Sequence, residues 1–151
     1  MTALTAERVR AAYDALGSGD RDRIAEYWAE DMRFLTPGNH PYAGWHNGLD
    51  AFVAFMDIVS KASNGSFDID IDVVLVNDEY SVDLNHTTAR RGHAGPDSDS
   101  PYDVLDIRGL HALQWRDGKV VEGRGAIFGD GMTNFNSWWS PLSEDGERTA
   151  L

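Results

Sequence analysis

The clearest hydrophobic pattern in the chain lies between Tyr102 and Phe128, where two strand-like runs, DVLDIRGLHALQW and KVVEGRGAIF, flank Arg116-Asp117-Gly118. Asp-Gly between apolar runs is the strongest short-range hairpin signal, because a tight primed turn needs a positive φ that Gly adopts at little cost. The pattern predicts a curved antiparallel sheet around which the other segments are organised. We expect a functional pocket between this sheet and the helices that precede it.

Apolar residues at helical spacing predict two helices near the N-terminus. The first begins after Thr5 and ends at Gly17 and Gly19, and the second begins after Asp20. A short strand over residues 32–35 follows them. Their apolar faces are formed by Val9, Ala12, Tyr13 and Leu16 in the first helix and by Ile24, Tyr27 and Trp28 in the second.

Residues 36–48 contain two prolines and three glycines and are predicted to form a loop, since these residues interrupt both helix and strand periods. Asn47, with Asp50 three residues later, resembles a capping box for a third helix. The stripe expected to be buried in that helix is Leu49, Phe52, Val53, Met56 and Val59.

From Phe67 onward the hydrophobic period changes to two, which predicts strands. The first runs from Phe67 to Val73, and the second, residues 80–91, places Val82, Leu84, His86 and Thr88 on one face. Residues 92–101 are predicted to be a flexible loop between strands. The aromatic segment 132–142 is expected to dock on the body, and residues 143–151 are expected to form a flexible tail.

Composition favours one globular domain over residues 1–151, with 42% hydrophobic and 11% aromatic residues and no cysteine. The net charge of -12 disfavours nucleic acid and anionic membranes as partners. There is neither a signal-peptide pattern nor an apolar run of membrane-spanning length, so a soluble, cytoplasmic protein is expected. Asp68, Asp70 and Asp72 match the start of a calcium loop but lack its Gly and terminal Glu, and no metal site is predicted.

The elements follow the order helix, helix, short strand, Pro-Gly loop, helix and four strands, which is an α+β order. In this order and in its motifs, the chain resembles the SnoaL-like family of the nuclear transport factor 2-like (ketosteroid isomerase-like) superfamily over about residues 6–140. The motifs that carry the resemblance are Gly19-Asp20, Tyr27-Trp28-Ala29-Glu30-Asp31, the Pro37-Gly38 to Gly44 segment, Asn77-Asp78-Glu79 and Trp115-Arg116-Asp117-Gly118-Lys119-Val120-Val121-Glu122. The resemblance implies a cone-shaped, curved antiparallel or mixed sheet wrapped around three N-terminal helices, an apolar pocket, a homodimer, and no metal or organic cofactor.

Only part of the family's catalytic set is carried over to this chain. The resemblance places Thr36 where ketosteroid isomerases keep a catalytic Asp, and His111 where they keep an oxyanion-binding Asp. Their helix-one Tyr falls on Ala12, with Tyr13 one residue away. Polyketide cyclases and epoxide hydrolases carry an acid on the final strand, and Asp130 is the nearest acid after Glu122, out of the usual register.

Two histidines are predicted to face the pocket. Alternation on the strand after Tyr102 groups His111 with Leu105, Ile107 and Leu113 on the apolar side, and the same argument places His86 inward on the neighbouring strand. Inward imidazoles can act as general base and acid near neutral pH, or each can be a core histidine hydrogen-bonded to a neighbour. Asp130 or Tyr42 is the expected partner in proton transfer, although Asp130 also suits a turn next to Gly.

The remaining site predictions concern the lining of the pocket. For the helix residues Tyr13 and Trp28, core packing is the alternative. The loop aromatics belong either to the pocket mouth or to the surface, and the tryptophans at 138 and 139 either close the pocket or contact a second subunit. The predicted lining residues are Tyr13, Trp28, Thr36, His40, Trp45, Phe52, Leu113, Arg124 and Trp138.

The resemblance implies a cofactor-independent cyclase or isomerase acting on a bulky, apolar, polyketide-type intermediate of secondary metabolism such as antibiotic biosynthesis. Such an enzyme works by folding a flexible substrate into a reactive shape and adding general acid and base groups. Two alternatives stay open. One is epoxide opening of the limonene epoxide hydrolase type, which needs Arg124 with Asp130 or Asp106 turned inward. The other is a non-catalytic small-molecule-binding or dimerisation module.

Overall fold

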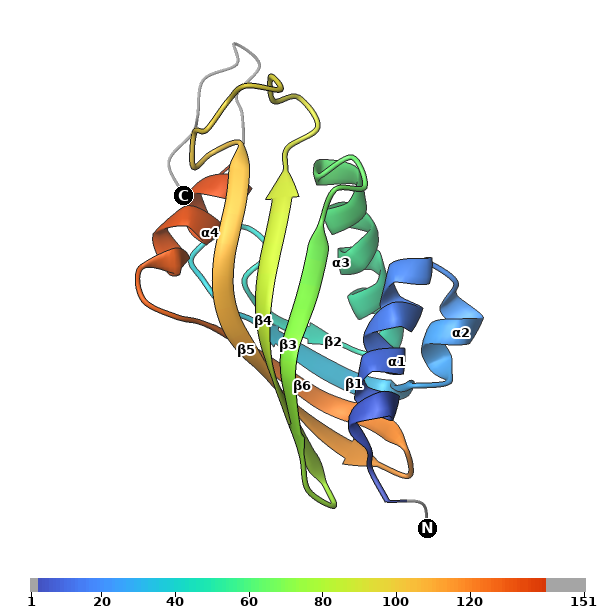
Figure 1. Ribbon diagram of the computed structural model, residues 1–151. Coiled ribbons are helices and arrows are strands. Elements are labelled where there is room, and N and C mark those ends of the chain that lie inside the picture. The colour runs from blue at the N-terminus through green and yellow to red at the C-terminus, as the bar shows by residue number, and fades with distance from the viewer. Residues whose placement is uncertain (1–2, 141–151) are drawn as a thin grey trace.

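The computed structural model describes residues 3–140 and arranges their strands in a six-stranded sheet with the order β2-β1-β6-β5-β4-β3 (Figure 1). β1 and β6 are parallel, and the other neighbouring strands are antiparallel. The strands are β1 (Trp28–Thr36), β2 (Gly44–Asn47), β3 (Asp68–Val76), β4 (Tyr80–Arg90), β5 (Val104–Arg116) and β6 (Lys119–Ile127). The helices are α1 (Ala6–Ser18), α2 (Arg21–Ala25), α3 (Leu49–Ala62) and α4 (Gly131–Trp139).

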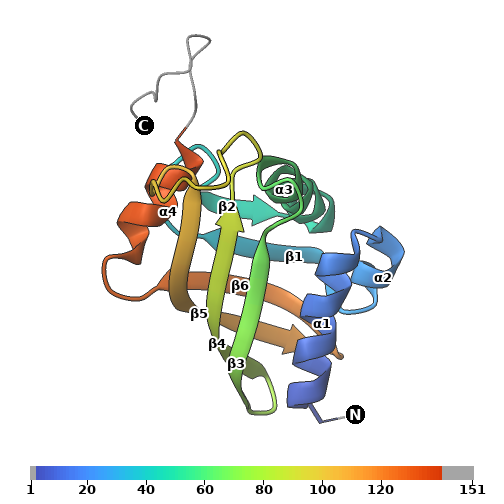
Figure 2. The same ribbon diagram turned by 45° about the horizontal axis from the view of Figure 1, so that its top comes forward.

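The sheet is strongly curved, and in Figure 2 β1, β2 and β6 run across the direction of β3, β4 and β5. Side chains of α1 and α3 meet the inward side chains of the strands around one cavity, and α4 packs against β5. The predicted α+β class with a curved mixed sheet is therefore confirmed. None of the helices within residues 3–140 is long and apolar enough to cross a membrane.

The turn between β5 and β6 has the geometry that its sequence predicts. Asp117 has φ +52° and Gly118 has φ +79°, and the flanking residues Arg116 and Lys119 are paired. Two consecutive positive φ values are the signature of the primed two-residue turn. This turn fixes the register of β5 against β6, and hence which β5 side chains face the cavity.

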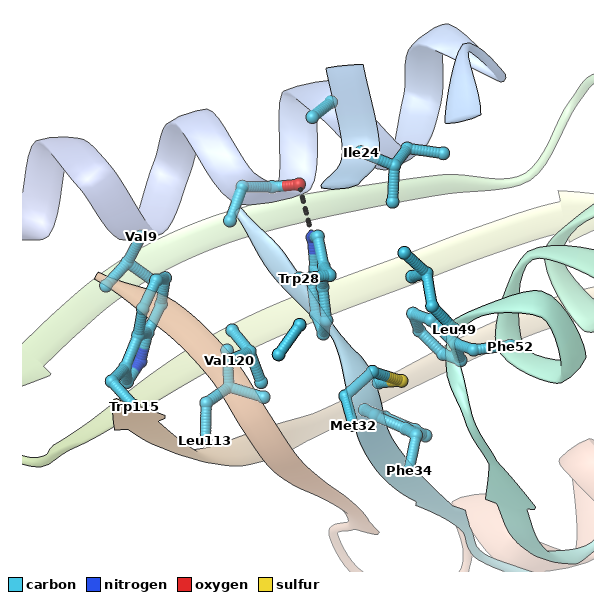
Figure 3. Close-up of a cluster of buried hydrophobic side chains, with 13 residues drawn as sticks. Val9, Ile24, Trp28, Met32, Phe34, Leu49, Phe52, Leu113, Trp115 and Val120 are labelled. Carbon is cyan, nitrogen blue, oxygen red and sulfur yellow. Dashed lines mark hydrogen bonds between the residues drawn. The ribbon is translucent and has the colours of Figure 1, made fainter. Parts of the chain in front are cut away.

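The core has two clusters, one on each side of the cavity. The first lies between α1, α3 and the start of β1, where Trp28 is fully buried and donates from Nε1 to the carbonyl oxygen of Ala12 at 3.0 Å (Figure 3). The second joins α3 and β5 to α4 through Phe55, Leu105 and Trp138. The cavity is lined from both clusters, which places it at the centre of the fold.

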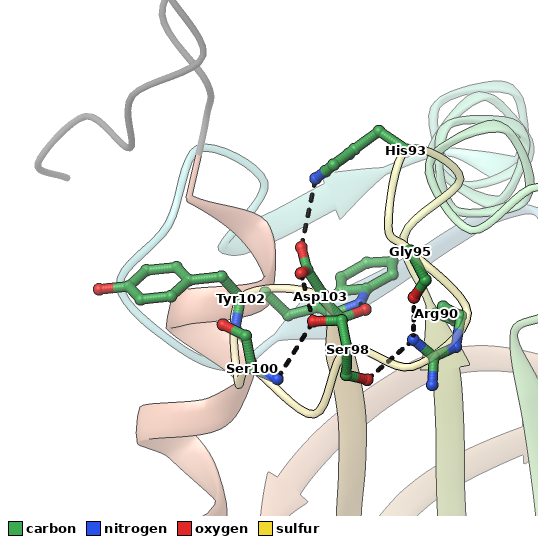
Figure 4. Close-up of polar contacts among 8 residues, drawn as sticks. Arg90, His93, Gly95, Ser98, Ser100, Tyr102 and Asp103 are labelled. Carbon is green, nitrogen blue, oxygen red and sulfur yellow. Dashed lines mark hydrogen bonds and ion pairs between the residues drawn. The ribbon is translucent and has the colours of Figure 1, made fainter.

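The connection from β4 to β5 is a loop, as predicted, and it is anchored by polar contacts (Figure 4). The Arg90 guanidinium donates to the carbonyl oxygens of Gly95 and Ser98, each at 2.9 Å. Ser98 in turn donates from Oγ to the Asp103 carboxylate at 2.7 Å, and His93 pairs with the same carboxylate at 3.3 Å. These contacts hold the loop near the buried indole of Trp138.

Several predicted boundaries are wrong for identifiable reasons. β1 begins at Trp28 because that residue already pairs with Val120 of β6, so Trp28 lies in a strand and outside α2. β2 lies inside the predicted loop, and Gly48 takes the N-cap position of α3 with no side-chain cap, so Asn47 forms no capping box. The predicted tail, residues 143–151, lies outside the described residues.

Candidate active site

An inner cavity of about 90 Å³ lies between the helices and the concave face of the sheet. It adjoins a groove of about 1050 Å³ between α1, α3 and β3, and the two spaces share Tyr13, Leu16, Met56, Val59, Phe67 and Ile69. The inner cavity alone is small for an extended ligand, whereas cavity and groove together exceed the usual volume of a ligand site, roughly 300 to 1,000 Å³. A bulky ligand would therefore occupy both spaces.

Small residues of β5 and β6 make room beside His111. Gly125 is paired with His111, and a Cβ added at Gly125 would lie 3.5 Å from the His111 ring and 3.2 Å from Pro37. The distance to Pro37 is tight, whereas the distance to the His111 ring is an ordinary van der Waals contact, so a side chain at Gly125 would press on Pro37 and cover the His111 ring. The imidazole of His111 consequently has one edge on the cavity without a neighbouring side chain from β6.

Asp83 is the buried acid of this site. It lies on β4 directly opposite His111, its side chain is fully buried, and its Oδ2 lies 3.1 Å from His111 Nδ1. Tyr13 of α1 donates its hydroxyl hydrogen to Asp83 Oδ1 at 2.5 Å, and its ring stacks on His111 with 5.6 Å between ring centroids. A helix and two strands thus bring a tyrosine, an aspartate and a histidine into one connected group.

Asn85 completes the environment of the carboxylate and defines the tautomer of His111. Its Nδ2 donates to Asp83 Oδ2 at 3.1 Å and lies 3.3 Å from His111 Nδ1. Because an amide nitrogen only donates and an ionised carboxylate is the strongest local acceptor, we assign the hydrogen on Nδ1 of His111 and direct it to Asp83. In the neutral ring Nε2 then carries the lone pair and is the nitrogen available to a ligand.

The electrostatics keep Tyr13 in its hydrogen-bond-donating form. Burial raises the pKa of the Tyr13 hydroxyl well above its ordinary value, and the neighbouring Asp83 carboxylate raises it further. A phenolate at this position would be desolvated and would face a carboxylate. Tyr13 therefore acts as a fixed donor to Asp83 and not as an acid at neutral pH.

The expectation that His86 faces the pocket is wrong. On β4 the buried positions are Ser81, Asp83, Asn85, Thr87 and Ala89, so the alternate set that contains His86 lies on the outer face. His86 Nε2 lies 2.6 Å from Oδ1 of Asp106, whose side chain is 68% exposed. The strand alternates as the sequence predicts, but its more polar set faces inward, where Asp83 and Asn85 form hydrogen bonds.

Asp130 and Tyr42, the other two predicted catalytic residues, also lie away from the cavity lining. Asp130 is exposed at the start of α4, where its carboxylate accepts a hydrogen bond from Thr133 Oγ1 at 2.7 Å. Tyr42 packs behind the lining, with its ring centroid 4.8 Å from that of Trp139. Neither is placed to exchange a proton with a ligand in the inner cavity.

Of the predicted lining residues, Tyr13, Trp28, Thr36 and Phe52 are on the cavity wall, and the others are not. His40 points its Nε2 at the Pro37 carbonyl oxygen at 3.0 Å, and burial lowers its pKa.

Trp45, Arg124, Leu113 and Trp138 lie elsewhere for different reasons. The Trp45 ring lies 4.0 Å from the guanidinium of Arg33 and 5.5 Å from that of Arg124, which is exposed. Leu113 packs in the first core cluster. Trp138 packs in the second, where its Nε1 donates to the Asp103 carbonyl oxygen.

The principal residues that the sequence analysis did not identify are Asp83 and Asn85, together with the cavity aromatics Phe34 and Phe55, whereas Trp139, one of the two tryptophans expected to close the pocket or contact a second subunit, lines the cavity. The signal for the first two was present. Asp and Asn are depleted in strand interiors, so their appearance at alternating positions in the middle of a strand indicates a special environment. Pairing of β4 with β5 was the missing information, because only that register places Asp83 opposite His111.

Comparison with known proteins identifies the family. The model of the SnoaL-like domain matches residues 9–123, and the chain belongs to the SnoaL-like family. Uncharacterized protein Rv0034 of Mycobacterium tuberculosis (strain H37Rv) is 30% identical over 74 residues, which make up 49% of this chain and 56% of that protein. The chain thus spans about half the length of that curated relative.

Solved structures with the same fold include Bal32a from a soil-derived mobile gene cassette, with a TM-score of 0.76 and 27% identity over 89% of this chain and 95% of Bal32a. Another is a protein from Jannaschia sp. CCS1 described as a candidate SnoaL-like polyketide cyclase, with a TM-score of 0.67 and 15% identity over 93% of this chain and 97% of that one. At this identity the second likeness shows the fold alone.

Proposed function

We propose that the protein is a cofactor-independent cyclase or isomerase that moves a proton at a carbon next to a carbonyl group in an apolar, polyketide-type substrate. The observation that carries the proposal is the Asp83–His111 pair at the edge of an aromatic cavity. Membership of the SnoaL-like family supports the same class of reaction.

His111 is the proposed general base. Nε2 would remove the proton from the activated carbon, and the same imidazolium would return it to the neighbouring position or to oxygen. Asp83 would stabilise the imidazolium and hold Nδ1–H in place, as the aspartate of a catalytic triad does. Tyr13 and Asn85 would fix the carboxylate, so that no reorganisation is needed when the positive charge forms.

The polar lining of the cavity favours an enzyme over a passive binding module. Its wall holds polar groups from three strands, Thr36, Asn85 and His111, whereas a binder of apolar molecules needs none. Epoxide opening loses support because Arg124 and Asp106 are on the outer face and Asp130 is exposed. These residues therefore form no Asp-Arg-Asp group around a water inside the cavity.

The test is deuterium incorporation from D2O into 1-indanone and 2-tetralone, followed by mass spectrometry. Wild-type protein is expected to accelerate exchange at the carbon next to the carbonyl group, and His111→Gln is expected to lower that rate by about 10² to 10⁴-fold. His86→Gln is the matched control, since its ring is on the outer face. Exchange at the wild-type rate in His111→Gln, or no acceleration by the wild-type protein, would refute the proposal.

We also propose a homodimer formed through the outer face near the β3–β4 hairpin. Val73, Leu75 and Tyr80 are 41%, 62% and 46% exposed there, which is unusual for large apolar side chains clustered on one hairpin. Light scattering should give the mass of a dimer for the wild type and of a monomer for Leu75→Glu. A monomeric wild type at micromolar concentration would contradict this assignment.

A further inference from the structure

Within residues 3–140, two buried polar atoms on residues of the cavity wall have no hydrogen-bond partner. They are Oγ1 of Thr36 and Nε1 of Trp139, and neither atom finds a donor or acceptor within the part of the chain that the structure describes. The two residues are 4% and 3% exposed, and both line the inner cavity. Buried polar groups are normally hydrogen-bonded, so two unbonded polar atoms on one cavity wall indicate that a ligand in the cavity supplies their hydrogen-bond partner.

The Trp139 side chain is held in place by its surroundings. Trp139 ends α4, and its ring stacks on His40 with 5.7 Å between centroids and meets Trp138 edge to face at 4.9 Å. Thr36 ends β1, and Pro37 follows it. Rotation to find another partner would break this packing of the indole, so its N–H is a fixed donor.

The position of Thr36 relative to His111 is set by the sheet. β6 lies between β1 and β5, so the two residues are two strand spacings apart, or roughly 10 Å between backbones. Their side chains converge on the concave face. A single rigid bicyclic molecule is long enough to touch both.

The chemistry of these atoms defines what they would bind. Indole N–H can only donate, and a threonine hydroxyl can donate as well as accept, so an acceptor oxygen is the partner that suits both atoms. The inner cavity is lined by no Lys or Arg side chain within residues 3–140, so a carboxylate or phosphate would enter without a counter-charge. A neutral carbonyl oxygen meets both conditions, and the aromatic wall favours a planar body.

We propose that Thr36 and Trp139 form a hydrogen-bonding subsite for a neutral carbonyl oxygen of a planar, apolar ligand, separate from the group that contains His111. The inference rests on the proposed function only in that the inner cavity is taken to be where the substrate binds. In this arrangement Thr36 and Trp139 orient the ligand. They hold one of its oxygens where β1 and α4 end, while His111 faces another part of the molecule.

The experiment compares 1-indanone with indane, its hydrocarbon counterpart, by measuring both dissociation constants in 1H–15N NMR titrations. The readout is the affinity of the ketone divided by that of the hydrocarbon. One hydrogen bond changes a binding constant by roughly two- to tenfold, so this ratio should fall by that factor in Thr36→Val and in Trp139→Phe. Thr36→Val keeps the shape of the side chain, and unchanged binding of indane verifies that the cavity is intact.

Matched controls separate this subsite from the proposed catalytic group. Trp45→Phe, on the outer face, should leave the ratio unchanged, and so should His111→Gln. The subsite is refuted if Thr36→Val and Trp139→Phe both retain the wild-type ratio, if the ratio falls in His111→Gln instead, or if the wild type binds neither compound. Proton exchange is measured separately, so a protein that shows the ratio effect without His111-dependent exchange keeps the subsite and loses the proposed reaction.

Discussion

Two histidine–aspartate pairs lie on opposite faces of the same two strands. His111 and Asp83 meet on the inner face at 3.1 Å, with side chains 17% and 0% exposed, and His86 and Asp106 meet on the outer face at 2.6 Å, with side chains 26% and 68% exposed. The shorter contact is the one nearer to water. Distance alone would therefore choose the wrong pair as the functional one.

Burial and further hydrogen bonds distinguish the inner pair. Asp83 accepts from Tyr13 and Asn85 in addition to its contact with His111, whereas each contact of the outer pair competes with solvent. An exposed histidine–carboxylate contact contributes about 0 to 1 kcal/mol, while each buried donor that loses its partner costs about 1 to 3 kcal/mol. The comparison predicts that equal substitutions in the two pairs have unequal effects.

The largest difference is expected from the conservative exchanges Asp83→Asn and Asp106→Asn. An amide at position 83 can donate to His111 Nδ1 and so move the ring hydrogen to Nε2, which removes the base. Ketone exchange should fall by about 10² to 10⁴-fold in Asp83→Asn and stay at the wild-type rate in Asp106→Asn. The 15N shifts of His111 should report the change of tautomer, and an unchanged tautomer together with full activity in Asp83→Asn would contradict the role assigned to the inner pair.

The free energy of unfolding should separate the pairs next. Asp83→Ala leaves buried donors on Tyr13, Asn85 and His111 without their acceptor, and a loss of at least about 3 kcal/mol is expected in urea unfolding. Asp106→Ala should cost less than about 1 kcal/mol. Equal losses in the two variants would show that the inner carboxylate has no special structural role.

The comparison also shows what could be read from the sequence and what could not. On β5 the apolar set, which includes Leu105 and Leu113, identified the inner face and placed His111 correctly. On β4 the same reasoning failed, because Val82 and Leu84 face outward and Asp83 and Asn85 face inward. Choosing the face by hydrophobicity assumes an apolar core, and that assumption fails where a cavity needs polar groups.

Long-range register was the other missing information. The β5–β6 pairing follows from the Asp117-Gly118 turn, but β4 reaches β5 through a loop that fixes no register. The contact of Asp83 with His111 therefore depends on the tertiary structure and could not be predicted from local sequence. A shift in the pairing of β3 between Ile71 and Val73 similarly turns Val73 outward, where alternation from Phe67 predicts it inward. The chain order and turns thus predicted the fold, whereas the site required pairings between distant segments.

A smaller effect is expected when the tyrosine that supports the inner pair is replaced. Tyr13→Phe removes a hydrogen bond to a charged group, which should cost about 1.5 to 3 kcal/mol at neutral pH. In the outer pair, the Asp106 carboxylate bonds to His86, and no other side chain within residues 3–140 donates a hydrogen bond to it as Tyr13 does to Asp83.

The pH dependence of this variant has a defined sign. Because the pKa of Tyr13 is raised in the folded state, the folded protein keeps this proton above pH 10 while the unfolded chain, with a pKa near its ordinary value, loses it. The Tyr13 contribution is fully present below about pH 10 and is lost as pH rises toward the folded pKa. Wild-type stability should therefore fall more steeply than that of Tyr13→Phe between about pH 10 and 11. Parallel stability curves would contradict the assignment of the buried hydroxyl.

The smallest effect is expected on the outer pair itself. His86→Gln should change the free energy of unfolding by less than about 1 kcal/mol, and raising the salt concentration from about 0.05 to 1 M should remove most of that difference because exposed charges are screened. The inner pair should respond little to the same change in salt, since solvent ions do not reach a fully buried carboxylate. Urea titrations of the wild type, His86→Gln and His111→Gln at both salt concentrations measure this. A salt response of equal size in the two variants would mean that the inner pair is open to solvent, and its assignment as the site of proton transfer would lose its physical basis.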